Sequence, residues 1–488
     1  MIKLDDIERI YFLGIGGIGM SALARYFMAK HFKVAGYDRD QSEICISLKK
    51  DSCEVSFDDD PTLIPPLFRE KTTTLVVYTP AIPEDNKLIK YFKDQDYLLC
   101  KRAEILGIIT ENLECLAIAG THGKTTISCL LAYLLSEILI DCSAFLGGIA
   151  TDFDSNLRIG SADIAVVEAD EFDRSFLKLS PNWALISSMD ADHLDIYGTA
   201  HHLVESFRLF SDKVEDGNLI VKEGLDIPSK YTYALSSDTA DFSAKNIRVE
   251  GGAYYFDLVY PKGVCENVIS GLPGIHNVEN ALAAFSMAYI QGLSVSGIVD
   301  SIASFSGVKR RFEYHLKTDD QIYIDDYAHH PKEIEVAIRS VRDLYPNKEL
   351  TIVFQPHLFS RTRDFMDDFA KVLSSADHVM LLDVYPAREL PIDGVNSSVL
   401  LNKITIKNQT NLGLGTTDYV ENVLRRAVGE DKAATVLGRI MPGSSSKGLE
   451  ILRWMDARSI ARPIPRICRD RGLGGGRAVF GRAATSPA

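Results

Sequence analysis

The chain has 488 residues, which is more than one hydrophobic core usually serves, and at about 150 residues per domain it predicts three domains. Hydrophobic residues make up 46% and charged residues 25%, so the composition is that of a globular protein and argues against extensive disorder. The net charge of −14 argues against a protein that binds nucleic acid or a membrane surface, because both need a basic face.

The N-terminus and the cysteines bear on the compartment. Met1–Asp6 is acidic where a signal peptide would be basic, and no apolar run approaches the ~18 residues of a membrane span. The eight cysteines are scattered without a Cys-x-x-Cys pair, which is typical of reduced thiols rather than of disulfides or a zinc site. We therefore expect a cytoplasmic protein that inserts into no membrane, binds no nucleic acid and is a monomer or a weak homodimer.

Short apolar runs alternate with segments of helical period along the first 400 residues. The expected strands are Arg9–Leu13, Lys33–Gly36, Thr74–Tyr78, Cys115–Ala119, Ile164–Val167, Trp183–Ser187, Gln321–Ile324, Glu349–Phe354 and His378–Asp383. The expected helices are Ser21–Lys30, Cys100–Leu106, Thr126–Ile138 and Asn277–Ile290. This alternation predicts an α/β fold with parallel sheets covered by helices on both faces.

Two domain boundaries are indicated inside the chain. One lies near Gly107–Asn112, where a helix ends before a new strand, and the other near Ser306–Arg311, where a glycine precedes a basic cluster. The composition changes again near the end, where residues 425–488 carry 13 Lys and Arg against 5 Asp and Glu. The expected domains are 1–108, 109–308 and 309–411, followed by an atypical Arg- and Gly-rich tail at 412–488 to which we assign no function.

A glycine loop at Gly14–Gly19 follows the first strand and opens a helix. It matches G-x-G-x-x-G, with Asp38 roughly 20 residues further on. The backbone N–H groups of such a loop bind a diphosphate at the helix N-terminus. The pattern specifies a diphosphate but no nicotinamide, so a UDP-sugar satisfies it as well as NAD does. A plain strand–helix turn is disfavoured because strand, glycines and distal acid occur together.

A second loop, Gly120–Thr126, has the form G-x-x-G-K-T between a strand and a helix. It is shorter than the Walker pattern, which would place a glycine at Ile118. Its backbone N–H groups would surround phosphate oxygens, Lys124 would neutralise charge, and the Thr125 hydroxyl would reach Mg²⁺. The loop therefore predicts ATP binding.

Two later strands end in groups that bind metals. Glu168, Asp170 and Glu171 close one strand, and Asp192 and His193 follow the next. Carboxylates at the C-terminal edge of a parallel sheet beside a phosphate loop favour a metal ion. We interpret His193 as a metal ligand, with a structural histidine as the alternative.

The remaining motifs lie at a helix start and at strand ends. His276 and Asn280 could hydrogen-bond an adenine edge, although helix capping also explains His276. Arg310–Arg311, Asp325–Pro331 and Gln355–Arg363 gather acids, histidines and arginines. Arginine suits a carboxylate or a transferring phosphoryl group, and solvated loop charges are the alternative.

Taken in order, these segments resemble the Mur ligases of bacterial peptidoglycan synthesis from about Ile7 to about Val395. The resemblance implies an N-terminal Rossmann-like domain that binds a UDP-sugar, a central P-loop ATPase domain and a C-terminal Rossmann-like domain that brings an amino acid. It implies an ATP- and Mg²⁺-dependent ligase that joins the carboxylate of UDP-N-acetylmuramate to L-alanine through an acyl phosphate. Beyond about Asn411 the family's closing strand and helix find no counterpart, so the third domain is expected to be incomplete.

The resemblance also implies roles for individual residues. The UDP-substrate would be bound by Gly14, Gly16, Gly17, Gly19, Asp38, Thr79 and Arg102. ATP would be bound by Gly120, Thr121, His122, Gly123, Lys124, Thr125, Thr126, His276, Asn280, Arg311 and Asp326. The metal ligands would be Thr125, Glu168 and His193, and the amino-acid pocket would hold Tyr327, His329 and Arg361. The groups expected to act in catalysis are Lys124, His193, His329 and Arg361.

Three other functions are weighed against this one. A ligase that attaches a preformed tripeptide to the same nucleotide is the nearest, but its third-domain loop differs from His357–Arg363. An NAD-dependent oxidoreductase is suggested by the first glycine loop, yet it leaves Lys124 unexplained. A non-catalytic nucleotide-binding regulator is favoured only if the tail disables the third domain.

Overall fold

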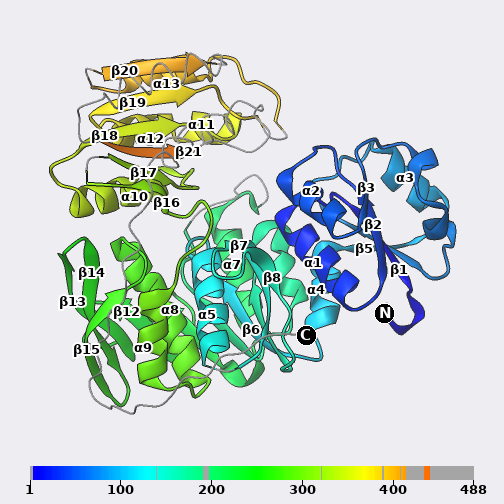
Figure 1. The fold of residues 1–488 in the computed structure, drawn as a ribbon, viewed down its shortest axis with the longest axis horizontal. Coiled ribbons are helices and arrows are strands. Elements are labelled where there is room, and N and C mark those ends of the chain that lie inside the picture. Colours follow the sequence, from blue (N-terminus) through cyan, green and yellow to red (C-terminus); the bar gives the residue numbers. More distant parts are fainter. Residues whose placement is uncertain are drawn as a thin grey trace, which may run out of the picture.

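The computed structural model describes residues 4–138, 140–190, 197–319, 321–386, 389–406, 408–413 and 434–439. It contains three sheets that follow one another along the chain, each covered by helices (Figure 1). The α/β fold expected from the sequence is confirmed. None of the helices in the described part of the chain has the length and apolar character that crossing a membrane requires.

The first sheet is a five-stranded parallel sheet in the order β3-β2-β1-β4-β5. Its strands are β1 (Arg9–Leu13), β2 (Lys33–Tyr37), β3 (Glu54–Ser56), β4 (Thr74–Tyr78) and β5 (Leu98–Lys101). Its helices are α1 (Ile18–Ala29), α2 (Glu43–Lys50), α3 (Lys87–Asp94) and α4 (Arg102–Thr110), with 3₁₀ turns η1 (Leu4–Asp6), η2 (Pro61–Leu63) and η3 (Pro66–Arg69). The strand order reverses between β1 and β4, which opens a crevice at their carboxyl ends.

One boundary in this first sheet differs from the expectation. The sequence predicted a helix from Cys100, whereas Cys100 and Lys101 end β5 and α4 begins at Arg102. The Glu104 carboxylate accepts a hydrogen bond from the Lys101 backbone N–H at 3.0 Å. This capping contact fixes the helix start two residues later than the apolar pattern suggested.

The second sheet has ten strands in the order β15-β14-β13-β12-β11-β10-β6-β9-β7-β8. The strands are β6 (Glu114–Ala119), β7 (Ser143–Ala150), β8 (Ser155–Arg158), β9 (Ile164–Glu168), β10 (Trp183–Ile186), β11 (Leu219–Lys222), β12 (Tyr231–Leu235), β13 (Phe242–Glu250), β14 (Ala253–Tyr260) and β15 (Gly263–Ser270). Its helical segments are α5 (Lys124–Glu137), η4 (Phe172–Lys178), α7 (Ala200–Ser211), η5 (Glu215–Gly217), α8 (Ile275–Ile290) and α9 (Val295–Ser304). β6 lies between β9 and β10 and is parallel to both, so the loop after β6 meets the carboxyl ends of two neighbours.

The third sheet has six strands in the order β16-β17-β21-β18-β19-β20. The strands are β16 (Glu313–Lys317), β17 (Gln321–Asp325), β18 (Glu349–Phe354), β19 (His378–Leu382), β20 (Asn408–Gly413) and β21 (Ala434–Arg439). The helices are α10 (Pro331–Leu344), α11 (Phe359–Asp364), α12 (Met366–Leu373) and α13 (Ser397–Lys403). β21 pairs in parallel with both β17 and β18. The sheet therefore extends past the boundary expected at residue 411, which falls inside β20.

The three units are packed together by apolar and polar contacts. One buried apolar cluster continues from the first unit onto one face of the second sheet, and another joins the opposite face to the third unit. Asn156 of β8 is fully buried against α1, where its side chain donates to the Ser21 hydroxyl and accepts from Arg25. Lys332 of α10 pairs with Asp190 after β10 at 3.1 Å, which links the third unit to the second.

Candidate active site

The loop between β6 and α5 has a backbone that requires glycine at two positions. Gly120 and Gly123 have φ angles of 134° and 80°. A Cβ at Gly120 would lie 2.1 Å from the Ser187 hydroxyl, and one at Gly123 would lie 2.6 Å from the Asn280 amide oxygen. The loop is thus pressed against β10 and α8, which brings Asn280 to the phosphate loop as expected, and the N-terminus of α5 lies at its end.

Thr121 and His122 continue this loop toward β10 and the third unit. The Thr121 hydroxyl accepts from the Asp190 backbone N–H at 3.0 Å, and the His122 ring lies 3.2 Å from Asp190 and 3.5 Å from Glu333. Burial alone would lower the pKa of His122, but these two carboxylates raise it above its ordinary value. His122 thus connects the phosphate loop to α10.

Lys124 is the cation of this loop. Its ammonium group donates to the Gly120 carbonyl at 2.6 Å and pairs with Glu171 Oε2 at 2.7 Å, and the Glu171 side chain is only 1% exposed. Burial alone would lower the pKa of Lys124, but Glu171, Asp170 and Glu168 raise it, so the side chain stays charged. An incoming phosphate would find a cation already oriented by a carboxylate.

A hydroxyl and a buried carboxylate lie beside Lys124, where α5 faces β9. The Thr125 hydroxyl donates to Glu168 Oε1 at 3.1 Å, and Glu168 Oε2 accepts from the Gly147 N–H at 2.9 Å. Burial raises the pKa of Glu168, and Lys124 opposes that rise. A hydroxyl and a buried carboxylate are hard oxygen ligands, and they fit Mg²⁺. His193, the third expected ligand, lies outside the described residues.

The first unit contributes its glycine loop. Gly14 has a φ of 86°, and a Cβ there would lie 2.7 Å from Thr79, so the two expected residues meet at the ends of β1 and β4. The Gly16 N–H donates to Asp38 at 2.8 Å. A Cβ at Gly19 would lie 2.3 Å from the Arg102 guanidinium. The crevice of the first sheet therefore holds the residues expected for a diphosphate; Gly17 follows in the same loop as the residue before α1.

Arg102 reaches from the first unit to the second. Its guanidinium donates to Asp170 at 2.9 Å. Burial alone would raise the pKa of Asp170, but Arg102 and Lys124 lower it. Asp170 thus lies between the cation expected at the UDP-substrate and the cation of the phosphate loop.

The connection to the third unit contains a strained turn. Arg310 and Phe312 both have positive φ, at 65° and 52°. The Asp326 carboxylate accepts from the Phe312 N–H at 2.9 Å and from the Ala328 N–H at 2.7 Å, and burial raises its pKa to about 6. Asp326, which we expected to bind ATP, stabilises this turn through its carboxylate.

The expected adenine residues lie at the start of α8. Burial and Arg311 lower the pKa of His276 to about 4, so its ring is neutral at pH 7. Its Nδ1 is buried and has no hydrogen-bond partner among the described residues. The Asn280 amide donates to Asn277 at 3.1 Å. A buried neutral nitrogen without a partner fits a ligand that supplies a donor, such as the adenine edge of ATP.

The third unit places aromatic rings and an arginine at its strand ends. The His329 Nδ1–H donates to the Tyr327 carbonyl at 3.0 Å, and the His329 and His357 rings lie 6.2 Å apart. Arg361 Nη1 donates to His357 Nδ1 at 3.3 Å. The His357 ring stacks on Tyr385 at 5.7 Å and 14°. His357 therefore links Arg361 to His329, which contacts Tyr327 directly.

The three units meet at one cavity of about 360 Å³. Of the residues expected to act, it is lined by Gly19, Arg102, Thr121, His122, Gly123, Lys124, Thr125, Glu168, Arg311, Tyr327 and His329. Gly14, Asp38, Thr79 and Thr126 do not line it, nor do His276, Asn280, Asp326 and Arg361. Its apolar wall includes Ile18, Leu106 and Phe145.

Two groups in or beside this site were not foreseen. Glu333 lines the cavity, where its carboxylate accepts from the His329 backbone N–H at 2.9 Å and faces the His122 ring. In the sequence it is one of several acids on an amphipathic helix, so nothing about it alone indicates a site residue. Its position two residues after a His-Pro pair at a helix start could have indicated a carboxylate that caps this helix beside the histidines. Tyr385 lies in a loop after β19, where its ring stacks on His357 and its backbone N–H donates to the Pro356 carbonyl at 2.8 Å.

Residues of all three units line one cavity, among them the lysine and threonine of the phosphate loop, and together with the fold this cavity defines an ATP-dependent ligase. Sequence profiles of three domains match this chain: the Mur ligase family catalytic domain at residues 9–113, the Mur ligase middle domain at 118–288 and the Mur ligase glutamate ligase domain at 310–437. The chain belongs to the Mur ligase family. This membership argues against the NAD-dependent oxidoreductase suggested by the first glycine loop.

Individual relatives agree with this membership. The UDP-N-acetylmuramate–L-alanine ligase of Christiangramia forsetii is 53% identical over 84% of this chain and 90% of its own, and that of Flavobacterium psychrophilum is 50% identical over 84% and 91%. The crystal structure of UDP-N-acetylmuramate–alanine ligase from Thermotoga maritima superposes with a TM-score of 0.78 at 23% identity, covering 93% of this chain and 99% of its own. At that identity the superposition shows the shared fold.

Proposed function

We propose that this ligase joins the carboxylate of UDP-N-acetylmuramate to the amino group of L-alanine. The carboxylate oxygen attacks the γ-phosphorus of ATP, the bond to ADP breaks, and an acyl phosphate forms. The alanine nitrogen then attacks the acyl carbon, loses a proton, and phosphate leaves. The observation that carries the proposal is the cavity shared by Arg102, Lys124 and His329, which come from three different units.

Charge neutralisation is the first demand of this reaction, because a carboxylate must approach a polyanion. Lys124 is held charged beside its carboxylate partner, and Arg311 lines the same cavity. Fixed cations that face developing negative charge in a cavity shielded from water lower the barrier more than mobile solvent does. Mg²⁺ held by Thr125 and Glu168 would supply further positive charge at the phosphates when it is bound.

Removal of a proton from the alanine amine is the second demand. The Tyr327 carbonyl can only accept a hydrogen bond, so a neutral His329 ring carries its proton on Nδ1 and its lone pair on Nε2. Glu333 lies 3.4 Å from that Nδ1 and would stabilise the protonated ring. We assign His329 as the base and Arg361 as the anchor for the alanine carboxylate.

The remaining assignments follow the same proposal. The domain at 1–108 would bind UDP, that at 109–308 would bind ATP through the phosphate loop, His276 and Asn280, and the third domain from residue 309 would bind alanine. We propose that the enzyme works in the cytoplasm as a monomer or a weak homodimer.

The deciding experiment measures phosphate release from the purified chain with Mg-ATP and UDP-N-acetylmuramate, with and without L-alanine. Release that depends on alanine, together with a mass gain of one alanyl group on the nucleotide sugar, would support the proposal. Release that requires a preformed tripeptide instead of alanine would establish the recycling ligase. Nucleotide binding without any release with either acceptor would refute both and leave a non-catalytic protein.

A further inference from the structure

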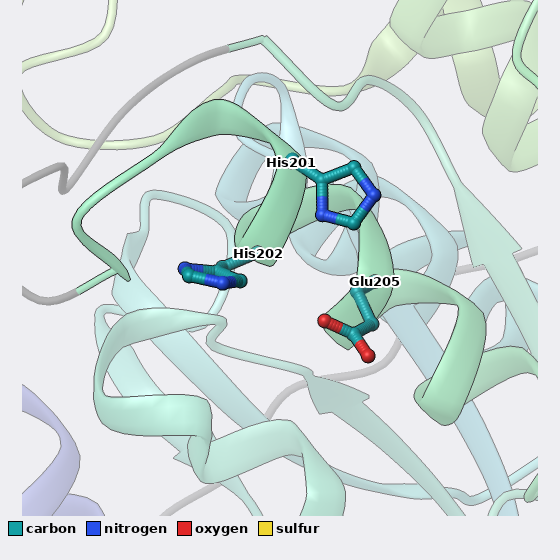
Figure 2. A group of neighbouring side chains, drawn as sticks. All are labelled: His201, His202 and Glu205. Carbon is teal, nitrogen blue, oxygen red and sulfur yellow. The ribbon is translucent and has the colours of Figure 1, made fainter.

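A group of metal-binding side chains lies on α7, outside the cavity. His201, His202 and Glu205 are exposed, and each offers one ligand atom within 4.8 Å of the other two. Figure 2 shows the three side chains on the first turns of the helix. The Thr199 hydroxyl caps this helix and accepts from the His202 backbone N–H at 3.3 Å, so the helix start that carries both histidines is fixed.

The spacing of these residues suits chelation. His201 and Glu205 are four residues apart, and residues at that spacing lie on one face of a helix with their side chains adjacent. His202 adds the second imidazole from the neighbouring position. Two imidazoles and a carboxylate provide three ligands, the number found in zinc sites that leave a fourth position to water.

An independent observation concerns the proton on His202. Its Nδ1 lies 2.9 Å from the Tyr197 backbone carbonyl. Because a carbonyl only accepts, Nδ1 carries the proton and the lone pair of the neutral ring is on Nε2. A ring nitrogen that donates to a backbone carbonyl is the usual support behind a metal-binding histidine. His202 is therefore already in the tautomer that a metal needs.

We propose that His201, His202 and Glu205 form a binding site for a transition-metal ion such as Zn²⁺. Imidazole nitrogens favour Zn²⁺, Co²⁺, Ni²⁺ and Cu²⁺, whereas Mg²⁺ favours oxygen ligands. The site is thus distinct in chemistry from the Thr125–Glu168 pair proposed for Mg²⁺.

The site is connected to the phosphate loop by two short contacts. Tyr197, whose carbonyl accepts from His202, also donates its hydroxyl to the Glu171 carbonyl at 2.5 Å. The Glu171 carboxylate is the partner of Lys124. A chain of contacts therefore runs from His202 through Tyr197 to Glu171, whose carboxylate pairs with Lys124.

The test uses the full chain without an affinity tag and Co²⁺ as the spectroscopic probe, in the presence of excess Mg²⁺. We expect one Co²⁺ per chain with the visible absorption of a nitrogen- and oxygen-ligated ion, displaced by Zn²⁺ and not by Mg²⁺. His201→Ala, His202→Ala and Glu205→Gln should each weaken Co²⁺ binding about tenfold or more. All three side chains are exposed, so each variant should keep the circular dichroism of the wild type.

His378→Ala is the matched control. His378 faces Glu349 at 3.5 Å, and no third metal-binding group joins this pair among the residues that the structure describes, so its loss should leave Co²⁺ binding unchanged. Equal binding by wild type and the His201→Ala/His202→Ala double variant would overturn the proposal. So would a thiolate-to-cobalt charge-transfer band, which would place the ion on a cysteine, or displacement by Mg²⁺ at the same concentration as by Zn²⁺.

Discussion

Replacement of Lys124 by methionine should cost both turnover and stability, and a second substitution should restore only stability. The ammonium group lies 2.7 Å from Glu171, whose side chain is 1% exposed, so Lys124→Met leaves a buried carboxylate without its cation. Breaking one side of a buried ion pair costs about 3–5 kcal/mol. For a domain of this size that corresponds to a fall of roughly 10 °C in the unfolding midpoint.

The double variant Lys124→Met/Glu171→Gln removes both charges and should regain most of that loss, because no uncompensated charge stays buried. Calorimetry without nucleotide measures the unfolding midpoint, and phosphate release measures turnover. Turnover should fall about 10²–10³-fold in both variants, since a fixed cation at the transferring phosphoryl group is missing in each. Normal turnover in Lys124→Met would refute the phosphate-loop assignment. A wild-type midpoint in that variant would refute the role of Glu171 as its buried partner.

Three further predictions follow from contacts in the site. Arg102→Ala should raise the KM for UDP-N-acetylmuramate about tenfold and leave that for ATP within twofold, and equal effects in steady-state kinetics would contradict its place at the first domain. Tyr385→Leu, which removes the ring stacked on His357, should raise the KM for L-alanine while Tyr385→Phe does not; identical kinetics of the two variants would show that the stack has no role. The pKa of His276 is about 4 in the folded chain and 6.5 in the unfolded chain. As the pH falls from 6.5 to 4, the unfolded chain therefore binds a proton on this ring that the folded chain does not, and the free energy of unfolding drops by up to about 3 kcal/mol. Urea titrations of His276→Asn should show a flatter dependence across that window, and an unchanged slope would contradict a neutral buried ring.

The fold could be predicted where local apolar runs decide it. Arg9–Leu13, Thr74–Tyr78 and Glu349–Phe354 were expected as strands and are observed with the same bounds, because buried parallel strands consist of continuous apolar residues. The start of α4 was misplaced because a side-chain cap, rather than an apolar period, sets it. β21 was missed because its position between β17 and β18 depends on a pairing with residues far away in the chain.

The sequence indicated which residues would line the cavity where they sit in a loop of recognisable form, as with Lys124 and Gly19. Contacts between residues of different units have no recognisable motif in the sequence. The Arg102–Asp170 pair joins residues 68 positions apart, and that of Asp190 with Lys332 joins residues 142 apart. The sequence shows Asp326 as an acid at a strand end, but it does not show the two backbone N–H groups that donate to its carboxylate.

The cavity formed by three domains has a consequence for inhibition. A compound that fills it contacts all three domains at once. Its apparent affinity is therefore its intrinsic affinity multiplied by the fraction of molecules in which the three domains are arranged around the cavity as in this structure. Substitutions at a domain junction, such as the contact of Lys332 with Asp190, would then lower drug sensitivity without touching the drug. Resistance to such compounds should therefore arise at these junctions as well as in the pocket itself.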